Sequence, residues 1–187
     1  FCRQHDVFIS TSLDGPEDLH NKNRPRRGKN SHALTAAGIR QVQNQLGRDR
    51  VSALMTTTAD SLPRVREIVD EYVRNDLHEI FFRPMSPYGF AVSGRHVDKY
   101  SANQWIDFFK QGLDYVLELN RHGYPLTEIY SAIILRKILT PQNPGYVDLQ
   151  SPSGIGIAGI IYNYDGDVYA SDESRMLAET GDPKFRL

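Results

Sequence analysis

The stretch "ISTSLDGPEDLHNKNRPR", which runs from Ile9 to Arg26, decides how the start of this sequence folds. It begins with β-branched residues, breaks at the Asp-Gly-Pro sequence of residues 14–16, and continues as a dense polar segment. Asp, Gly and Pro are typical turn residues, so we predict a buried strand over residues 5–13 and a polar loop after it. The most reactive side chains of the stretch therefore follow the end of a buried strand.

Strand-like and helix-like segments alternate through the first half of the sequence. The predicted elements are a helix from Ser31 to about Leu46, a strand from Arg50 to Thr58, a helix after Ser61, and a strand from His78 to Met85. Uninterrupted strand–helix–strand units are typical of right-handed crossovers, so we predict a parallel sheet. After it we predict helices over residues 101–122 and 127–139, and a β-hairpin whose turn is Asp165-Gly166.

Composition limits the class of protein. The 187 residues are 40% hydrophobic and 24% charged, which indicates a globular chain. A net charge of −1 argues against nucleic acid as a partner. No apolar run approaches the roughly 18 residues that span a bilayer, which argues against a membrane. The single cysteine, Cys2, excludes an internal disulfide and fits a reducing, cytoplasmic compartment.

The first residue is Phe1 rather than Met, and we expect this sequence to be a piece of a longer protein.

Polar side chains follow each predicted strand, at the edge where parallel sheets bind ligands. Ser10, Ser12 and Asp14 share one face of the first strand by its period of two. The second strand ends in the threonines 56–58, and the third carries Arg83. Hydroxyls, a carboxylate and a guanidinium around one mouth suit a ribose or an amino-acid moiety, with arginine available for a carboxylate.

The same residues also have purely structural explanations. Asp14 before Gly-Pro is equally consistent with a turn residue that bonds its own backbone, and threonine runs are ordinary in strands. His20 and His32 are expected to be surface residues rather than ligands or bases. The sequence has no Gly-rich phosphate loop, G-x-S-x-G elbow or zinc-like histidine spacing, which argues against dinucleotide, nucleoside triphosphate and serine-hydrolase functions.

The opening stretch resembles the fourth-strand segment of radical S-adenosylmethionine enzymes that modify peptides. The matching positions are Ser12, Asp14, Gly15, Pro16, His20 and Arg24. The segment "DRVSALMTTT" resembles the fifth strand of these enzymes, and "EIFFRPMSPYGFA" resembles the sixth. Two later segments, "LTPQNPGYVDLQSPSG" and "YNYDGDVYASDESRMLAETGD", are most similar to the radical maturase of the His-Xaa-Ser repeat peptide system.

This resemblance implies an α/β fold: the C-terminal half of a partial (β/α)6 TIM-like barrel, followed by helices and a β-hairpin. Residues 1–97 would hold barrel strands four to six with their helices, and residues 98–145 a helical segment. Residues 146–187 would form the hairpin that starts a SPASM-like extension.

The resemblance also implies S-adenosylmethionine as a cofactor. Its binding residues would be Ser10, Ser12, Asp14, Arg24, Thr57 and Arg83. Ser12 would lie near the ribose or amino-acid end, Arg24 would face the carboxylate, and Asp14 would position substrate or shape the turn. The parent enzyme would generate a 5′-deoxyadenosyl radical, shielded from water, and modify a precursor peptide with His-Xaa-Ser repeats, using electrons from a reductant protein.

Two departures from the family pattern matter. The C-x-x-x-C-x-x-C motif, whose thiolates hold a 4Fe–4S cluster, is absent, so the cluster ligands would lie outside this chain and the chain alone would be inactive. Many relatives also carry an auxiliary cluster, but Ser171 stands where a cysteine would follow Gly166, and serine is a poor ligand for such clusters.

Two other functions remain open from the sequence. One is a non-catalytic peptide-binding module that keeps the fold without the cluster. The other is a TIM-type hydrolase or aldolase that works through Asp14 and His20. Three cysteines at the family spacing elsewhere in the protein would exclude the module, and activity without iron would support the hydrolase.

Overall fold

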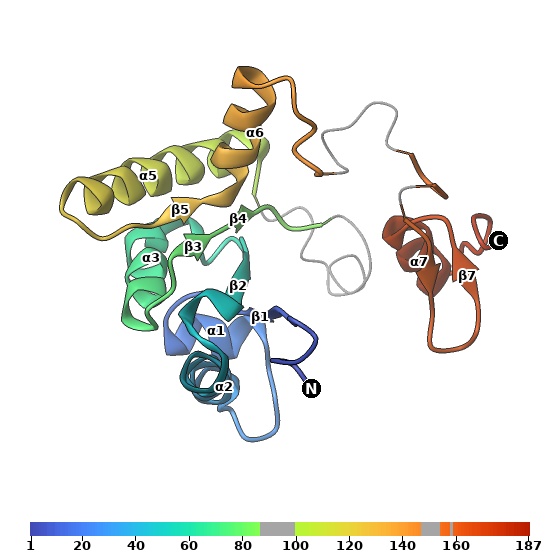
Figure 1. The fold of residues 1–187 in the computed structure, drawn as a ribbon, viewed down its shortest axis with the longest axis horizontal. Helices are drawn as coiled ribbons and strands as arrows, with labels where there is room; N and C mark the ends of the chain where they lie inside the picture. The colour runs from blue at the N-terminus through green and yellow to red at the C-terminus, as the bar shows by residue number, and fades with distance from the viewer. Residues whose placement is uncertain (87–99, 147–153, 158) are drawn as a thin grey trace. The chain divides into compact units, whose positions relative to one another are not determined.

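The computed structural model describes residues 1–86, 100–146, 154–157 and 159–187, which form two compact units (Figure 1). The first unit contains Phe1–Met85 and residues 100–132, and the second contains Ser86 and the described residues of Ile133–Leu187. All residues of the predicted site belong to the first unit. Every helix in the described ranges is too short or too polar to cross a membrane.

A three-stranded parallel sheet lies in the first unit. Its order is β1 (Ile9–Ser12), β2 (Val51–Thr56) and β4 (Phe82–Arg83). The predicted parallel pairing of these segments is confirmed. β1 begins at Ile9 rather than at residue 5, because residues 2–6 form turns in which Asp6 has a positive φ of 52°.

The predicted strand from His78 to Met85 is divided between two sheets. Its first part, β3 (Glu79–Ile80), pairs in parallel with β5 (Thr127–Glu128), and its second part is β4. β5 lies where the sequence predicted the start of a helix, and α6 (Ile129–Leu139) begins only after it. The Glu128 carboxylate accepts two backbone N–H groups of the first turn of α6, at 3.1 and 2.6 Å, and so caps this helix.

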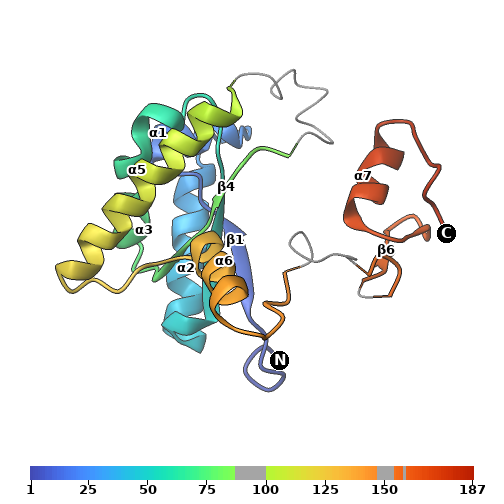
Figure 2. The same ribbon diagram turned by 90° about the horizontal axis from the view of Figure 1, so that it is seen from above.

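Three helices pack on one face of the sheet (Figure 2). They are α2 (Ser31–Leu46), α3 (Val65–Arg74) and α5 (Ala102–Arg121). Alternate residues of β2 are buried with them in one core: Val51, Ala53 and Met55, together with Ile39 of α2, Ile68 of α3 and Phe108 of α5. The other β2 residues, Ser52, Leu54 and Thr56, are only half-buried and mark what we call the open face of the sheet.

The ends of the helices follow capping chemistry. Ser101 Oγ accepts the N–H of Gln104 at 3.3 Å, and Gln104 Oε1 accepts the N–H of Ser101 at 2.8 Å. This capping box confirms the predicted start of α5 at Ser101. Short 3₁₀ turns, η1 (Arg48–Arg50) and η2 (Leu62–Arg64), precede β2 and α3.

The segment predicted as a polar loop forms a helix, α1 (Glu17–Asn23). The loop prediction was wrong because only Leu19 and His20 are buried in this short helix, too few to give an apolar period in the sequence. Pro16 stands at its N-cap, and two acidic residues occupy its first turn, where the helix dipole favours negative charge.

The second unit contains the predicted hairpin and a helix that was not predicted. β6 (Ile161–Tyr162) pairs antiparallel with β7 (Val168–Tyr169), which confirms the hairpin. α7 (Asp172–Glu179) follows, and Ser171 Oγ accepts the N–H of Ser174 at 3.2 Å as its N-cap. The serine at the expected cysteine position therefore starts a helix in this chain.

Candidate functional site

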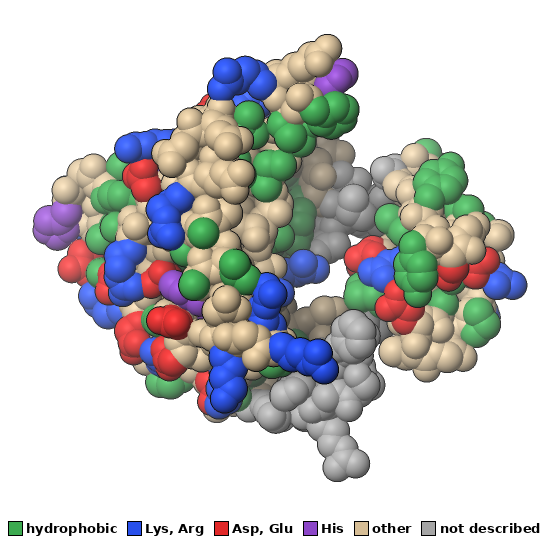
Figure 3. All heavy atoms as spheres, turned by 90° about the horizontal axis from the view of Figure 1, so that it is seen from below, with side chains coloured by type: hydrophobic (Ala, Val, Ile, Leu, Met, Phe, Trp, Pro, Cys, Tyr) green, Lys and Arg blue, Asp and Glu red, His purple; other side chains and the backbone are tan. Residues whose placement is uncertain are grey.

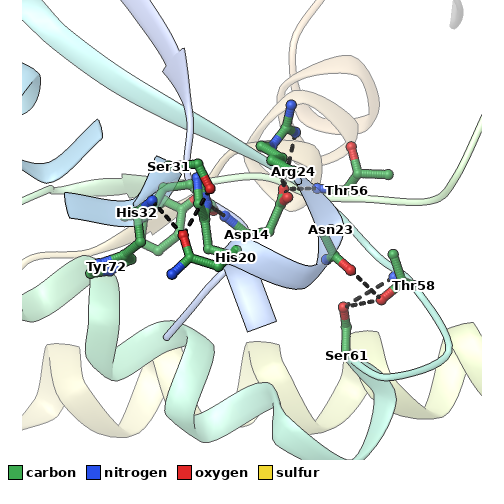
Figure 4. A network of polar contacts seen from close by, with 12 residues as sticks. Asp14, His20, Asn23, Arg24, Ser31, His32, Thr56, Thr58, Ser61 and Tyr72 are labelled. Carbon is green, nitrogen blue, oxygen red and sulfur yellow. Dashed lines mark hydrogen bonds and ion pairs between the residues drawn. The ribbon is translucent and has the colours of Figure 1, made fainter. Parts of the chain in front are cut away.

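Asp14 is a buried carboxylate at the end of β1, with 1% of its surface exposed. Its Oδ2 accepts Arg24 Nε at 2.8 Å, and its Oδ1 accepts Arg24 Nη2 and the Thr56 N–H, each at 3.1 Å (Figure 4). Three N–H donors around one carboxylate compensate for its removal from water. Asp14 thereby joins the end of β1 to the end of α1 and to the end of β2.

Arg24, directly after α1, is held by Asp14 and yet remains accessible. Its side chain is 39% exposed. The bonds to Asp14 use Nε and Nη2, and Nη1 has no hydrogen bond to any described residue. A planar guanidinium that is fixed along one edge can bind an anion along another. Nη1 is therefore not used by any described residue and is available to an anion.

His20 is buried beside this ion pair, so the prediction that it lies on the surface was wrong. α1 turns His20 inward together with Leu19. His20 Nδ1 accepts the Asp14 N–H at 3.1 Å, which places the proton of the neutral ring on Nε2. Burial lowers the pKa of His20, the Asp14 carboxylate opposes this shift, and Arg24 adds to it.

His32, also predicted at the surface, is mostly buried as well. Its Nε2 lies 2.9 Å from Glu71 Oε1, and its ring meets the His20 ring edge-on with 5.8 Å between centroids. The buried Glu71 also accepts Asn75 Nδ2 at 2.8 Å and pairs with Arg74. The two histidines thus link the Asp14 region to α3.

Lowering the pH from about 7.5 to about 5.5 is expected to destabilise the protein through His20. The folded-state pKa of His20 lies below the unfolded value near 6.5, so the unfolded state binds the proton first and stability falls as the pH drops below that value. Each pKa unit between the two states corresponds to about 1.4 kcal/mol. His20 faces Asp14, Arg24, His32 and Glu71, none of which is changed in His20→Asn. That variant should lose less stability over the same range in urea unfolding, and equal losses would exclude His20 as the cause.

Three of the predicted site residues share the open face of the sheet. In the parallel register, Ser10, Ser12 and Arg83 lie beside Ser52, Leu54 and Thr56. Residues side by side in register point to the same face. Ser10 and Arg83 are exposed and Ser12 is half-buried, so their polar groups are accessible on that face.

Thr57 does not join this group. It continues the buried alternation of β2 and is fully buried. Its N–H donates to the Arg83 carbonyl at 2.8 Å, and its own carbonyl accepts the Tyr100 hydroxyl at 3.1 Å. Among the described residues, no partner bonds its Oγ1. Thr56 rather than Thr57 presents its side chain on the open face.

Two residues that the sequence analysis did not single out for the site support it. The buried Tyr72 hydroxyl donates to the Leu13 carbonyl at 2.9 Å, and burial raises the pKa of Tyr72 well above its usual range. Tyr72 lies in the helix predicted after Ser61, but a helical period in the sequence does not say where its hydroxyl points. Asn23 Oδ1 accepts the Thr58 hydroxyl at 3.4 Å, next to Ser61 Oγ, which accepts the Thr58 N–H at 3.0 Å.

A metal centre is not formed by the described part of this chain. Cys2 is the one cysteine of the sequence. No group of three or more His, Cys, Asp or Glu side chains comes together as metal ligands within the described ranges.

Comparison with known proteins shows the fold. No protein-family model matches the chain. The uncharacterized protein sll1766 of Synechocystis sp. is 35% identical over 82 residues, which are 43% of this chain and 20% of that protein. Native anSMEcpe with bound AdoMet (S-adenosylmethionine) matches the whole chain with a TM-score of 0.75 and 18% identity. Native anSMEcpe with bound AdoMet and Kp18Cys peptide matches it with a TM-score of 0.70, also at 18% identity.

The chain shares this fold. It spans about half the length of the anSMEcpe chains, 48% and 49% in these two structures. The predicted α/β class is therefore confirmed as a mixed α/β chain that matches half of anSMEcpe. At 18% identity, the likeness concerns the fold and not the activity.

Proposed function

We propose that this chain forms half of the cofactor cavity of a radical S-adenosylmethionine enzyme that modifies peptides. The observation that carries this proposal is Arg24, fixed by the buried Asp14 at the end of a sheet face that Ser12 and Arg83 share. The same stretch resembles the fourth-strand segment of these enzymes, and the matching structures of anSMEcpe contain AdoMet. Since the chain spans half of those structures, we propose that it is the C-terminal half of a partial (β/α)6 barrel completed by residues outside it.

The residues of the open face fit S-adenosylmethionine. Ser10 and Ser12 offer hydroxyls to its ribose or amino-acid end, and Arg24 Nη1 offers N–H groups to its carboxylate. Arg83 extends the same face, while Thr57 contributes through its backbone bonds. When bound, S-adenosylmethionine supplies the chemistry that removes a hydrogen atom from a substrate. The residues of this chain bind it, orient it and exclude water.

A 4Fe–4S cluster does not fit the residues of this chain. Such clusters are held by several thiolates, and Cys2 alone cannot replace them. We therefore propose that the cluster ligands lie outside this chain, that a separate reductant protein supplies electrons, and that the 187 residues alone do not turn over.

A ribosomally made precursor peptide is the proposed substrate. Two anSMEcpe structures contain peptides, Kp18Cys and Cp18Cys. The second unit, proposed as the start of a SPASM-like extension, carries apolar side chains on its surface (Figure 3), among them the strongly exposed Ile155, Ile157, Tyr162 and Tyr164. Exposed aromatic and aliphatic side chains suit peptide binding. The narrower assignment to peptides with His-Xaa-Ser repeats rests on the resemblance of residues 139–154 and 162–182.

The hydrolase or aldolase alternative loses its main support. Asp14 and His20 are both buried, and the Asp14 carboxylate and His20 Nδ1 are bonded inside the protein. A general base must reach the proton that it removes. The peptide-binding module stays the alternative proposal, because catalysis depends on cysteines outside the chain. A C-x-x-x-C-x-x-C motif in the complete gene product would exclude it.

Arg24→Ala in the complete gene product is expected to weaken AdoMet binding about 10- to 100-fold while the iron content stays normal. The reason is that a charge-assisted hydrogen bond is worth about 1.5–3 kcal/mol, and about 1.4 kcal/mol is tenfold in affinity. Arg26→Ala is the matched control, since Arg26 is exposed two residues further along and forms no ion pair within the described structure. Isothermal titration calorimetry measures both affinities. Unchanged affinity in Arg24→Ala would remove this residue from the site.

A further inference from the structure

Asp14 is held in place by three different elements. Its N–H donates to His20 Nδ1 at 3.1 Å, and the carbonyl of the preceding Leu13 accepts the Tyr72 hydroxyl at 2.9 Å. Its carboxylate accepts the Thr56 N–H at 3.1 Å. Because these bonds tie Asp14 to α1, α3 and β2, the carboxylate has no freedom to swing out toward the open face.

Arg24 takes its orientation from this fixed carboxylate. The two bonds, at 2.8 and 3.1 Å, use one edge of the guanidinium. A free arginine side chain loses rotamer entropy when a ligand orders it. For Arg24 much of that loss occurs on folding, so a ligand that bonds Nη1 meets a guanidinium already in place. The Asp14–Arg24 pair also carries no net charge, so bond geometry selects the ligand more than charge does.

We propose that Asp14 is a positioning residue, which holds Arg24 so that Nη1 bonds the carboxylate of S-adenosylmethionine, and that His20 in turn holds Asp14. The assignment rests on the proposed function, because it takes S-adenosylmethionine as the ligand. It differs from both roles that the sequence left open for Asp14: the residue neither touches substrate nor merely closes a turn.

The binding of two nucleosides can distinguish a positioning role of Asp14 from general structural support. AdoMet carries the amino-acid carboxylate, whereas 5′-methylthioadenosine has the adenosine and the sulfur without it. In the complete gene product, Asp14→Asn should weaken AdoMet binding about tenfold and change the affinity for methylthioadenosine less than about twofold, both by calorimetric titration. In an Arg24→Ala background, Asp14→Asn should cause no further loss, because the two residues act through one contact.

The outcomes distinguish this assignment from the cofactor proposal. The positioning role would be overturned if Asp14→Asn weakened the binding of AdoMet and of methylthioadenosine equally. It would also be overturned if a folded Asp14→Asn protein bound AdoMet with unchanged affinity. Either result would leave the cofactor proposal standing. Binding of neither nucleoside to the unsubstituted protein would overturn both.

A second variant covers the case in which Asp14→Asn does not fold. Arg24→Lys keeps the charge, but an ammonium group cannot form the two-point contact with Asp14 and also present a fixed planar donor. AdoMet should then bind about tenfold more weakly, with methylthioadenosine unchanged. Full AdoMet affinity in Arg24→Lys would overturn the positioning role.

Discussion

Gly15→Ala is expected to lower the free energy of unfolding by about 2–6 kcal/mol, as measured by urea unfolding. Gly15 has a φ of 127°, and an alanine in such a backbone conformation costs roughly 1–3 kcal/mol. A Cβ at this position would also lie 2.8 Å from Ile68 Cγ1 and 3.2 Å from Leu19 Cδ2, and overpacking a filled core costs about 1–3 kcal/mol. The glycine after Asp14 therefore lets the strand end approach α3 closely.

A second glycine separates the two contributions. Gly123 also has a positive φ, 91°, but a Cβ there would contact nothing within 4 Å. Gly123→Ala should lose only the backbone term of roughly 1–3 kcal/mol. If the free energy of unfolding falls no more in Gly15→Ala than in Gly123→Ala, then Ile68 and Leu19 move aside freely. Close packing would then not explain why residue 15 is a glycine.

The parallel sheet is predictable because its signals are local. β1 is marked by β-branched residues before a turn sequence, and β2 by an apolar run that ends in threonines. Ser101 with Gln104 three residues later likewise marks the start of α5. β3 and β5 were missed as separate elements for the opposite reason. A two-residue strand carries no period, and it exists only through a partner distant in sequence, here Glu79 beside Thr127.

The site is less predictable, because it depends on which way each side chain turns. Asp14 and Arg24 are ten residues apart, and their bond forms because α1, which was not predicted, brings the second back to the first. Three consecutive threonines give no alternation to follow, so the sequence could not distinguish the buried Thr57 from Thr56. The burial of His20 likewise follows from the packing of α1 and from no pattern around it.

Phe82→Ala is expected to lower the free energy of unfolding by about 3–5 kcal/mol. Phe82 is fully buried, and its ring meets the rings of Phe108 and Phe109 edge-on at 5.5 and 6.0 Å. Its ring carbons also lie 2.7 Å from where a Cβ of Gly112 would be, so α5 packs directly on the ring. Because α5 presents only its backbone at Gly112, that position has no side chain that could move into the cavity that alanine leaves.

The same substitution tests whether this packing holds Arg83 in the sheet. β4 is only two residues long, and the Arg83 carbonyl accepts the Thr57 N–H at 2.8 Å. Without the Phe82 ring, β4 should separate from β2 more often, so the Thr57 amide should exchange its hydrogen faster than in Phe8→Ala. Phe8 is 50% exposed, and its loss should cost less than about 0.5 kcal/mol. Unchanged Thr57 protection in a destabilised Phe82→Ala protein would mean that β4, and Arg83 with it, is held by its backbone bonds rather than by the aromatic core.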